Sequence, residues 1–453
     1  MKIKREFINF MLLASAVACA ALTCAADGYW DARFGGQGLD GIVNAVAVGG
    51  TNVYVGGSFT KAGSVNATNI ARWDGTGWSA LGSGVNNQVY ALAVHGTQVY
   101  AGGKFTQAGS VNANFVAKWN GSSWSALGSG ANNGVSGYVY ALAARTDGPA
   151  GVYVGGPFVS ANKSDGSSLT VNYVAQWISN SWSTLGTGVG GTVYAITASG
   201  SNAYVGGNFT SASPVSANHI ARWNNGWSAL TNFFGGQDGV NGYVNAIAVS
   251  GSNVYVGGNF TGAAGGASAT NIAMYDCSSI PGIPTWRGVG GGLNDVVRTM
   301  AASGTNVYVG GYFTMAGTNS AKYIARWDGA SWSALGSGLS GGSEHLEPGV
   351  GQIYVGGGFS TAGGKPSYDF AIWRETPVLR PDIVGIHFSG PDCLINFISQ
   401  AGQEYYAERC NNLPTNNWFA FTNLIGGYSG SITVTDRLAA INATNRFYRV
   451  RSQ

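Results

Sequence analysis

The segment Ser343-Glu-His-Leu-Glu-Pro348 brings three ionisable side chains together, in a chain of which only 9% of the residues are charged. Glu344 and Glu347 could serve as acid and base or as oxygen ligands of a cation, and His345 could transfer a proton near neutral pH. Because a calcium ion needs several converging oxygens, two carboxylates alone do not predict one. The segment is therefore a candidate for a ligand site or for acid–base chemistry.

The other residues with reactive side chains are scattered. His95, His219 and His387 have no spacing typical of a metal site. Asp74 and Asp328 lie in W-D-G phrases, where turn formation explains them. No G-x-S-x-G phrase or phosphate loop joins a strand to a helix, because no helix is predicted. We therefore assign no catalytic residue and no metal ligand, and we predict no cofactor.

An eight-residue phrase, V-Y-V-G-G-x-F-T in its commonest form, recurs seven times. Successive copies are 46 to 53 residues apart, and a fixed period near fifty is typical of one supersecondary unit repeated in an array. This array says more about the fold than any local pattern. The phrase is centred on Tyr54, Tyr100, Tyr153, Tyr204, Tyr255, Tyr308 and Tyr354.

Each repeat has the pattern of four short strands. In the second repeat these are Val89–Val94, Gln98–Gly102, Phe115–Trp119 and Trp124–Leu127, separated by glycine- and asparagine-rich turns. Four antiparallel strands per fifty residues are typical of a propeller blade, whereas a β-solenoid would have shorter repeats with parallel rungs. The sequence predicts an all-β fold with a seven-bladed β-propeller over residues 27–374.

The two ends of the array complement each other. The seventh repeat stops after its third strand, Phe370–Trp373, and has no Trp-x-x-Leu strand. A matching aromatic segment, Tyr29–Phe34, precedes the first complete repeat. We expect the N-terminal strand to complete the last blade, because this pairing removes two open sheet edges at once.

The first strands of the repeats carry a variable residue at their second position. Counting back from Tyr354 places Glu344, His345 and Glu347 on the strand that should line the central channel of the propeller. One hypothesis is a polar ligand or cation site at the channel mouth. The alternative is a decayed last repeat in which Arg298 and Glu344 form only a structural ion pair. The variable residues are Asn44, Tyr90, Tyr140, Tyr194, Asn245, Arg298 and Glu344.

Pairs of aromatic residues flank the turn between the third and fourth strands. Large rings in equivalent places in every repeat favour packing between blades, and a row of sugar-stacking tryptophans is the alternative. The pairs are Trp73/Trp78, Trp119/Trp124, Trp177/Trp182, Trp223/Trp227, Tyr275/Trp286 and Trp327/Trp332.

A glycine pair after an apolar strand, followed by spaced aromatic residues, resembles the kelch repeat. The resemblance covers about residues 28 to 374, from the pair Gly56-Gly57 to the pair Gly356-Gly357, although a tryptophan usually replaces the kelch tyrosine in the third strand. The fuller phrase resembles a kelch-like repeat of secreted bacterial proteins. Kelch-like families include binding scaffolds and a few extracellular copper oxidases, so the resemblance implies a fold and leaves function open.

Residues 1–26 have the pattern of a signal peptide: a basic end, the apolar stretch Phe7–Leu22, and small residues before a cleavage point after Ala26. An uncleaved anchor helix is the alternative. Removing the segment takes away three positive charges and one negative charge, which lowers the net charge from +3 to +1. We expect a secreted or cell-surface protein without a membrane span, and no nucleic acid partner, because phosphate binding needs clustered basic residues.

The tail forms a separate unit. Residues 375–382 have the composition of a linker, and residues 383–453 contain five or six short strand patterns that predict a small β-sandwich. Cys393 and Cys410 lie symmetrically about Ala401-Gly402; if these form a hairpin turn, the two cysteines face each other and a disulfide is expected. Cys277 would remain a free, partly buried thiol.

The leading functional hypothesis is an exported, monomeric, non-catalytic propeller that binds a glycan or a protein. Its long connections between second and third strands, such as Thr60–Asn69, Thr106–Asn114 and Val159–Asn172, should share one face with the links between repeats. Two alternatives remain: an extracellular enzyme (a hydrolase, lyase or kelch-type oxidase) at the channel mouth, and a structural surface or matrix protein.

Overall fold

A computed structural model describes most of residues 28–375 and the six strands between residues 383 and 452. The predicted signal peptide lies outside the described residues, and so do residues 27, 37, 130–132, 164, 233–237, 278–283, 376–382, 390–391, 400–402, 411–418, 427–429, 437–446 and 453. The described part is built of strands, and its helical segments are the 3-10 turns η1 (Arg33–Gly35) and η2 (Ala264–Gly266). It contains no helix with the length and apolarity that a bilayer crossing requires.

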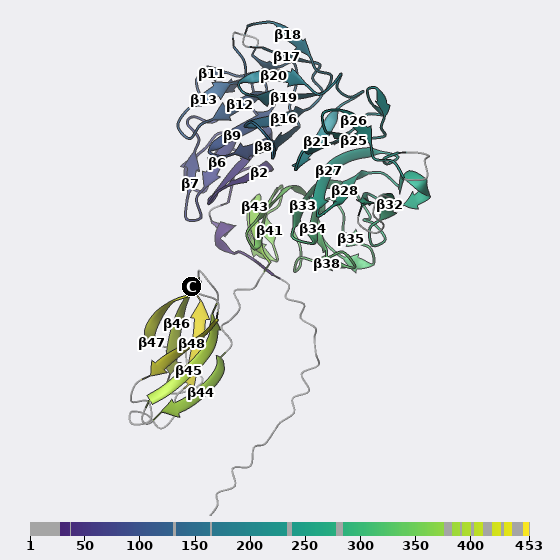
Figure 1. Ribbon diagram of the computed structural model, residues 1–453. Helices are drawn as coiled ribbons and strands as arrows, with labels where there is room; N and C mark the ends of the chain where they lie inside the picture. Colours follow the sequence, from purple (N-terminus) through teal and green to yellow (C-terminus); the bar gives the residue numbers. More distant parts are fainter. Residues whose placement is uncertain are drawn as a thin grey trace, which may run out of the picture.

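Residues 28–375 form seven four-stranded antiparallel sheets, one for each repeat, which are numbered here as blades 1 to 7 in repeat order. In blade 2 the strands follow the predicted bounds closely: β8 (Val89–His95), β9 (Gln98–Gly103), β12 (Val116–Trp119) and β13 (Trp124–Ala126). The expected β-propeller is confirmed (Figure 1).

The remaining blades repeat this order. The first strands are β2 (Val43–Gly49), β15 (Ala141–Ala144), β21 (Val193–Ser199), β27 (Tyr243–Ser250), β33 (Val297–Ser303) and β39 (Ser343–Gly349). The second strands are β3 (Asn52–Gly57), β16 (Gly151–Gly155), β22 (Asn202–Gly207), β28 (Asn253–Asn259), β34 (Asn306–Gly311) and β40 (Gln352–Gly357). The third strands are β6 (Ile70–Trp73), β19 (Val174–Ile178), β25 (Ile220–Trp223), β31 (Ile272–Asp276), β37 (Ile324–Trp327) and β43 (Phe370–Arg374). The fourth strands are β7 (Trp78–Ala80), β20 (Ser181–Thr184), β26 (Trp227–Ala229), β32 (Thr285–Gly288), β38 (Trp332–Ala334) and, for blade 7, β1 (Tyr29–Trp30).

The blades close into a ring through the N-terminal strand, as expected. Each first strand contacts the first strand of the next blade, and β39 of blade 7 contacts β2 of blade 1. Strand β1 pairs with β43, so that Trp30 lies opposite Trp373 with their ring centroids 5.3 Å apart. Asp31 fastens this seam by accepting hydrogen bonds from Arg33 at 2.8 Å and Arg374 at 3.1 Å.

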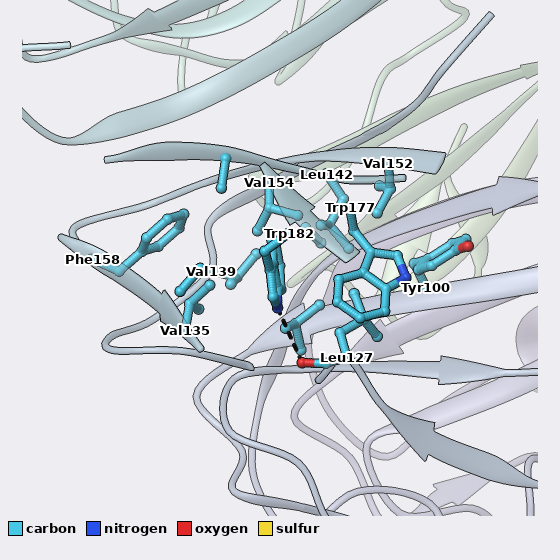
Figure 2. Packing of buried hydrophobic residues seen from close by; sticks show 14 of the residues in the cluster. Tyr100, Leu127, Val135, Val139, Leu142, Val152, Val154, Phe158, Trp177 and Trp182 are labelled. Atoms are coloured by element: carbon cyan, nitrogen blue, oxygen red, sulfur yellow. Dashed lines mark hydrogen bonds between the residues drawn. The ribbon is translucent and has the colours of Figure 1, made fainter. Parts of the chain in front are cut away.

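The tryptophans pack between blades, which confirms their predicted structural role. In blade 3, Trp177 and Trp182 are cross-strand partners with ring centroids 5.2 Å apart. The indole N–H of Trp182 donates to the Leu127 carbonyl of blade 2 at 3.1 Å, so one ring joins two blades (Figure 2). Equivalent bonds at 2.8 to 3.4 Å are made by Trp30, Trp124, Trp227, Trp286 and Trp332.

The glycine pair leaves room for a β-bulge in the first strand. A methyl group on Gly102 would lie 2.4 Å from Val139 Cγ1 of the next blade, and one on Gly103 would lie 2.1 Å from the Gln88 carbonyl oxygen. Opposite this pair, the register of β8 shifts between Val89 and Ala91, which leaves Tyr90 as the bulged residue. Six first strands share such a shift: β2, β8, β21, β27, β33 and β39.

The connections between second and third strands are not open loops but small hairpins, which in blade 3 gain a third short strand. In blade 1, β4 (Lys61–Ala62) pairs with β5 (Val65–Asn66), and Ala62 also bridges Leu39 of the segment before β2. The predicted common face of these connections and the links between blades is therefore confirmed. The other hairpins are β10 (Gln107–Ala108) with β11 (Val111–Asn112), β17 (Ser160–Asn162) with β18 (Ser168–Thr170) and β14 (Gly134–Val135), β23 (Ser211–Ala212) with β24 (Val215–Ser216), β29 (Gly262–Ala263) with β30 (Ala267–Ser268), β35 (Met315–Ala316) with β36 (Asn319–Ser320), and β41 (Thr361–Ala362) with β42 (Lys365–Pro366).

The tail contains six strands, where five or six were predicted, in two three-stranded sheets ordered β44-β45-β48 and β47-β46-β49. Because β45 and β46 lie in different sheets, the predicted hairpin between them is wrong, and Cys393 and Cys410 are not cross-strand partners. The side chains of these cysteines lie outside the described residues, so their disulfide stays a prediction. Cys277 is free and half-buried, as expected. The strands are β44 (Ile383–Ser389), β45 (Asp392–Ser399), β46 (Gln403–Cys410), β47 (Phe419–Gly426), β48 (Gly430–Asp436) and β49 (Phe447–Ser452).

Candidate functional site

The first strands surround a cavity of about 820 Å³ at the centre of the propeller. In six blades the variable second residue is the bulged residue of its strand, and a bulge turns a side chain away from the regular alternation of the sheet. All nine residues that the sequence singled out line this cavity: Asn44, Tyr90, Tyr140, Tyr194, Asn245, Arg298, Glu344, His345 and Glu347. We call it the channel site.

Three neighbouring blades contribute a run of tyrosines, which we call the tyrosine arc. The ring centroids of Tyr90 and Tyr140 are 5.6 Å apart, and those of Tyr140 and Tyr194 are 6.0 Å apart. Burial raises the pKa of Tyr90 and of Tyr140, so both phenols are neutral at physiological pH. The hydroxyls of Tyr140 and Tyr194 have no hydrogen-bond partner within the described part of the chain, which leaves them available to a ligand.

An ion pair lies across the channel from the tyrosine arc. Arg298 Nε donates to Glu344 Oε2 at 3.1 Å, and the Tyr312 hydroxyl donates to Glu344 Oε1 at 2.5 Å. The expected neighbours on blades 6 and 7 are thus paired, and both oxygens of Glu344 are engaged. The two Nη groups of Arg298, whose side chain is 45% exposed, have no partner among the residues described here.

The two asparagines among the variable residues of the first strands form hydrogen bonds with the neighbouring blade. Asn44 Nδ2 donates to the Val89 carbonyl at 3.1 Å, and Asn245 Nδ2 donates to the Val297 carbonyl at 3.0 Å. Each bond joins the first strands of adjacent blades. These side chains therefore hold the channel wall together as well as lining it.

His345 and Glu347 lie deeper along β39. The Val48 amide of blade 1 donates to Glu347 Oε1 at 3.4 Å, and within the described residues neither side chain has another hydrogen bond. Burial raises the pKa of Glu347 to about 7 and lowers the pKa of His345 to about 4. Near neutral pH the imidazole of His345 is therefore neutral, and the carboxyl group of Glu347 is present in both its protonated and its ionised form.

The sequence analysis missed three tyrosines near the channel mouth. Tyr138 stacks edge-on against Phe115 with centroids 5.6 Å apart, and the Lys104 ammonium lies 5.6 Å from its ring centre. Tyr243 and Tyr312 are 47% and 45% exposed. Two sequence positions could have revealed them: the residue before each first-strand valine, and the variable residue of the G-G-x-F phrase.

Cation-binding groups are sparse. Across the described residues no three His, Cys, Asp or Glu side chains gather in a way that could hold a metal ion. The three ionisable side chains of β39 therefore differ: both carboxylate oxygens of Glu344 are engaged by Arg298 and Tyr312, whereas His345 and Glu347 line the cavity without an ionic partner in the part of the chain that the structure describes.

Comparison with known proteins assigns no family to this chain. No protein-family model and no curated protein sequence matches the chain. Among solved structures, the computationally designed protein Ika8 is 16% identical, with a TM-score of 0.45, over 79% of this chain and 94% of its own. The β-propeller domain of the trilobed protease from Pyrococcus furiosus is 10% identical, with a TM-score of 0.42, over 73% of this chain and 95% of its own. YjhT is 14% identical, with a TM-score of 0.35, over 76% of this chain and 100% of its own.

Proposed function

We propose that this chain is a secreted or cell-surface binding protein, and that its kelch-like propeller holds a glycan at the channel site without catalysing a reaction on it. The observation that carries this proposal is the division of the channel wall into a tyrosine arc and an opposing polar side with Arg298. Aromatic rings offer apolar area together with a polar hydroxyl, which suits a ligand that has apolar faces and hydroxyl edges.

Charge favours a glycan over a strongly charged ligand. The carboxylate of Glu344 neutralises Arg298, so the mouth of the channel has polar groups but little net charge. The free Nη groups of Arg298 and the hydroxyls of Tyr140 and Tyr194 can donate or accept hydrogen bonds at the edge of a sugar. A cavity of about 820 Å³ falls within the range of small-molecule sites, roughly 300–1,000 Å³.

Export and the tail belong to the same proposal. The predicted signal peptide of residues 1–26 supports secretion, and the low content of charged residues is compatible with a surface made polar by Ser, Thr, Asn and Gly. The two three-stranded sheets of the tail support a small β-sandwich. We propose that this module accompanies the propeller outside the cell.

The test is a glycan-array screen of the mature protein, followed by calorimetry with the best ligand. Tyr140→Ala should weaken binding at least about tenfold, because it removes the central ring of the tyrosine arc. Tyr368→Ala is the matched control, since Tyr368 is 47% exposed and is not part of the cavity wall. Equal losses in both variants, or exclusive binding to proteins, would overturn the proposal. Turnover of the bound glycan would favour the enzyme alternative.

A further inference from the structure

The channel site has a second level below the tyrosine arc. Tyr194 is the second residue of its first strand and Thr197 the fifth, and both line the cavity. On blade 7 the same two levels are occupied by Glu344 and Glu347. With a rise of about 3.3 Å per residue, the levels are roughly 10 Å apart along the strand. A ligand that reaches both levels is therefore longer than one sugar ring.

At the lower level blade 7 differs from the other six. The residues equivalent to Glu347 are small in every other blade: Ala47, Ala93, Ala143, Thr197, Ala248 and Ala301. Four of these alanines are at most 6% exposed. The fold thus needs only a methyl group here. A carboxyl group in this place destabilises the protein unless it has a partner.

No such partner exists in the described part of the protein. The bond from the Val48 amide is long, at 3.4 Å, and leaves Oε2 without a donor. The elements packed against β39 are β2, β33, β34 and β40. Strand β2 has no ionisable residue, Arg298 of β33 is paired with Glu344, and the tyrosines of β34 and β40 are neutral because burial raises the pKa of Tyr308 and of Tyr354. His345 beside Glu347 is neutral as well.

We propose that Glu347 is the specificity determinant for a primary ammonium group on the leading sugar of the bound glycan, so that the natural ligand ends in an amino sugar with a free amine. This inference rests on the proposed function. Among the charged residues that line the cavity, Glu347 carries the single carboxylate without a cationic partner. An ammonium group has three donors and would satisfy both carboxylate oxygens at the lower level while the next sugar stacks on the tyrosine arc.

The experiment compares three tetrasaccharides of equal linkage: glucosamine, glucose and N-acetylglucosamine tetramers. Calorimetry at pH 7 with the mature protein should show the glucosamine tetramer binding at least about tenfold more tightly than the glucose tetramer, as expected for a charged group meeting a partly buried carboxylate. Glu347→Gln keeps the shape of the side chain and should reduce this preference to near unity. Affinity for the glucose tetramer should stay the same in both proteins.

A second readout is the proton balance. An ammonium group binds the ionised form of Glu347, so at pH 6 the wild-type protein should release a proton when it binds the glucosamine tetramer, and Glu347→Gln should release less. Titrations in two buffers with different ionisation enthalpies measure this release. Because the readout is a difference in protons, it separates a charge effect from a change in shape.

The outcomes distinguish this inference from the proposed function. Equal affinity of the wild type for glucosamine and glucose tetramers, or a preference that survives in Glu347→Gln, overturns the inference and leaves glycan binding intact. Tighter binding of the glucosamine tetramer than of the glucose tetramer, with affinities for both that Tyr140→Ala leaves unchanged, supports Glu347 but contradicts the tyrosine arc. If no tetramer binds and the glycan screen finds no ligand, both are wrong.

Discussion

Blades 2 and 7 have the same four-stranded order but differ in the strand that faces the channel. In blade 2 the third and fifth residues of the first strand are Ala91 and Ala93, each 6% exposed and packed in the core between blades. In blade 7 the same positions hold His345 and Glu347. The difference shows which features build the propeller and which are additional, because the other six blades fold without an ionisable residue at these two positions.

The two blades also close differently. Blade 2 takes all four strands from one continuous stretch of chain, whereas blade 7 takes its fourth strand, β1, from the N-terminus. The bonds are nevertheless equivalent: the indole N–H of Trp124 donates to the Leu81 carbonyl, and that of Trp30 to the Leu335 carbonyl, both at 2.9 Å. The large separation in sequence between β1 and β43 therefore affects the entropy of closing the ring of blades, but not the contacts that hold the last blade together.

The largest predicted effect is a loss of stability, and it tests whether Trp30 and Trp124 are equivalent. Trp30→Ala removes a ring that is 4% exposed, together with its bond to blade 6. We expect it to lower the free energy of unfolding by about 3–5 kcal/mol, as is typical of buried tryptophan truncation. Trp124→Ala is the matched variant in blade 2. Denaturant titration should give similar losses, and a loss below about 1 kcal/mol for Trp30→Ala would mean that the N-terminal strand does not hold the ring closed.

The next prediction concerns the stability of two variants in which the fifth residue of the first strand is exchanged between blades 2 and 7. Ala93→Glu places a carboxyl group in the packed core between blades 2 and 3 and should destabilise the protein by about 3 kcal/mol. Glu347→Ala introduces the alanine that five other blades have at this position and should stabilise the protein. Thermal unfolding of both variants at pH 8 checks this. Tolerance of Ala93→Glu would show that the fifth position is not a packing position.

The repeat made most of the fold readable from the sequence, because a strand pattern confirmed by six other copies is not a local coincidence. It predicted the blades, the closure by Tyr29–Trp30 and the ring of variable residues. Pairing over long distances was harder. The hairpin proposed between Cys393 and Cys410 was wrong because adjacent strands β45 and β46 joined different sheets, and Tyr312 was missed because its bond to Glu344 spans two blades.

A smaller predicted effect is the pH dependence of stability that the carboxyl group of Glu347 causes. Burial raises its pKa to about 7 from 4.5, so the folded state binds the proton more tightly than the unfolded state. The resulting stability is fully present below pH 4.5 and is lost as the pH rises through about 7. Relative to Glu347→Gln, the wild type should therefore lose up to about 3 kcal/mol between pH 4.5 and pH 8. If the stability of the two proteins changes with pH in parallel, the pKa of Glu347 is not raised in the folded state.

The smallest predicted effect concerns a hydrogen bond that is missing at the seam between blades 7 and 1 but present at two other seams. Asn69 and Asn271 each adopt a positive φ and donate from Nδ2, at 2.9 Å, to a carbonyl of the next blade, at Val85 and Leu293 respectively. The equivalent residue of blade 7 is Asp369, with a φ of 61°, and the equivalent carbonyl belongs to Leu39. An ionised aspartate has no N–H to donate there. Burial accordingly raises the pKa of Asp369 to about 6.

Asp369→Asn should restore the missing donor and stabilise the protein by about 1 kcal/mol at pH 7, the usual net contribution of one hydrogen bond. Because the raised pKa means that protonated Asp369 is the favoured native form, the gain should shrink as the pH falls below about 6. Asn69→Asp is the reciprocal variant and should destabilise the protein at pH 7. If both substitutions change stability in the same direction, the seam between blades 7 and 1 is not built like the seams that Asn69 and Asn271 form after blades 1 and 5.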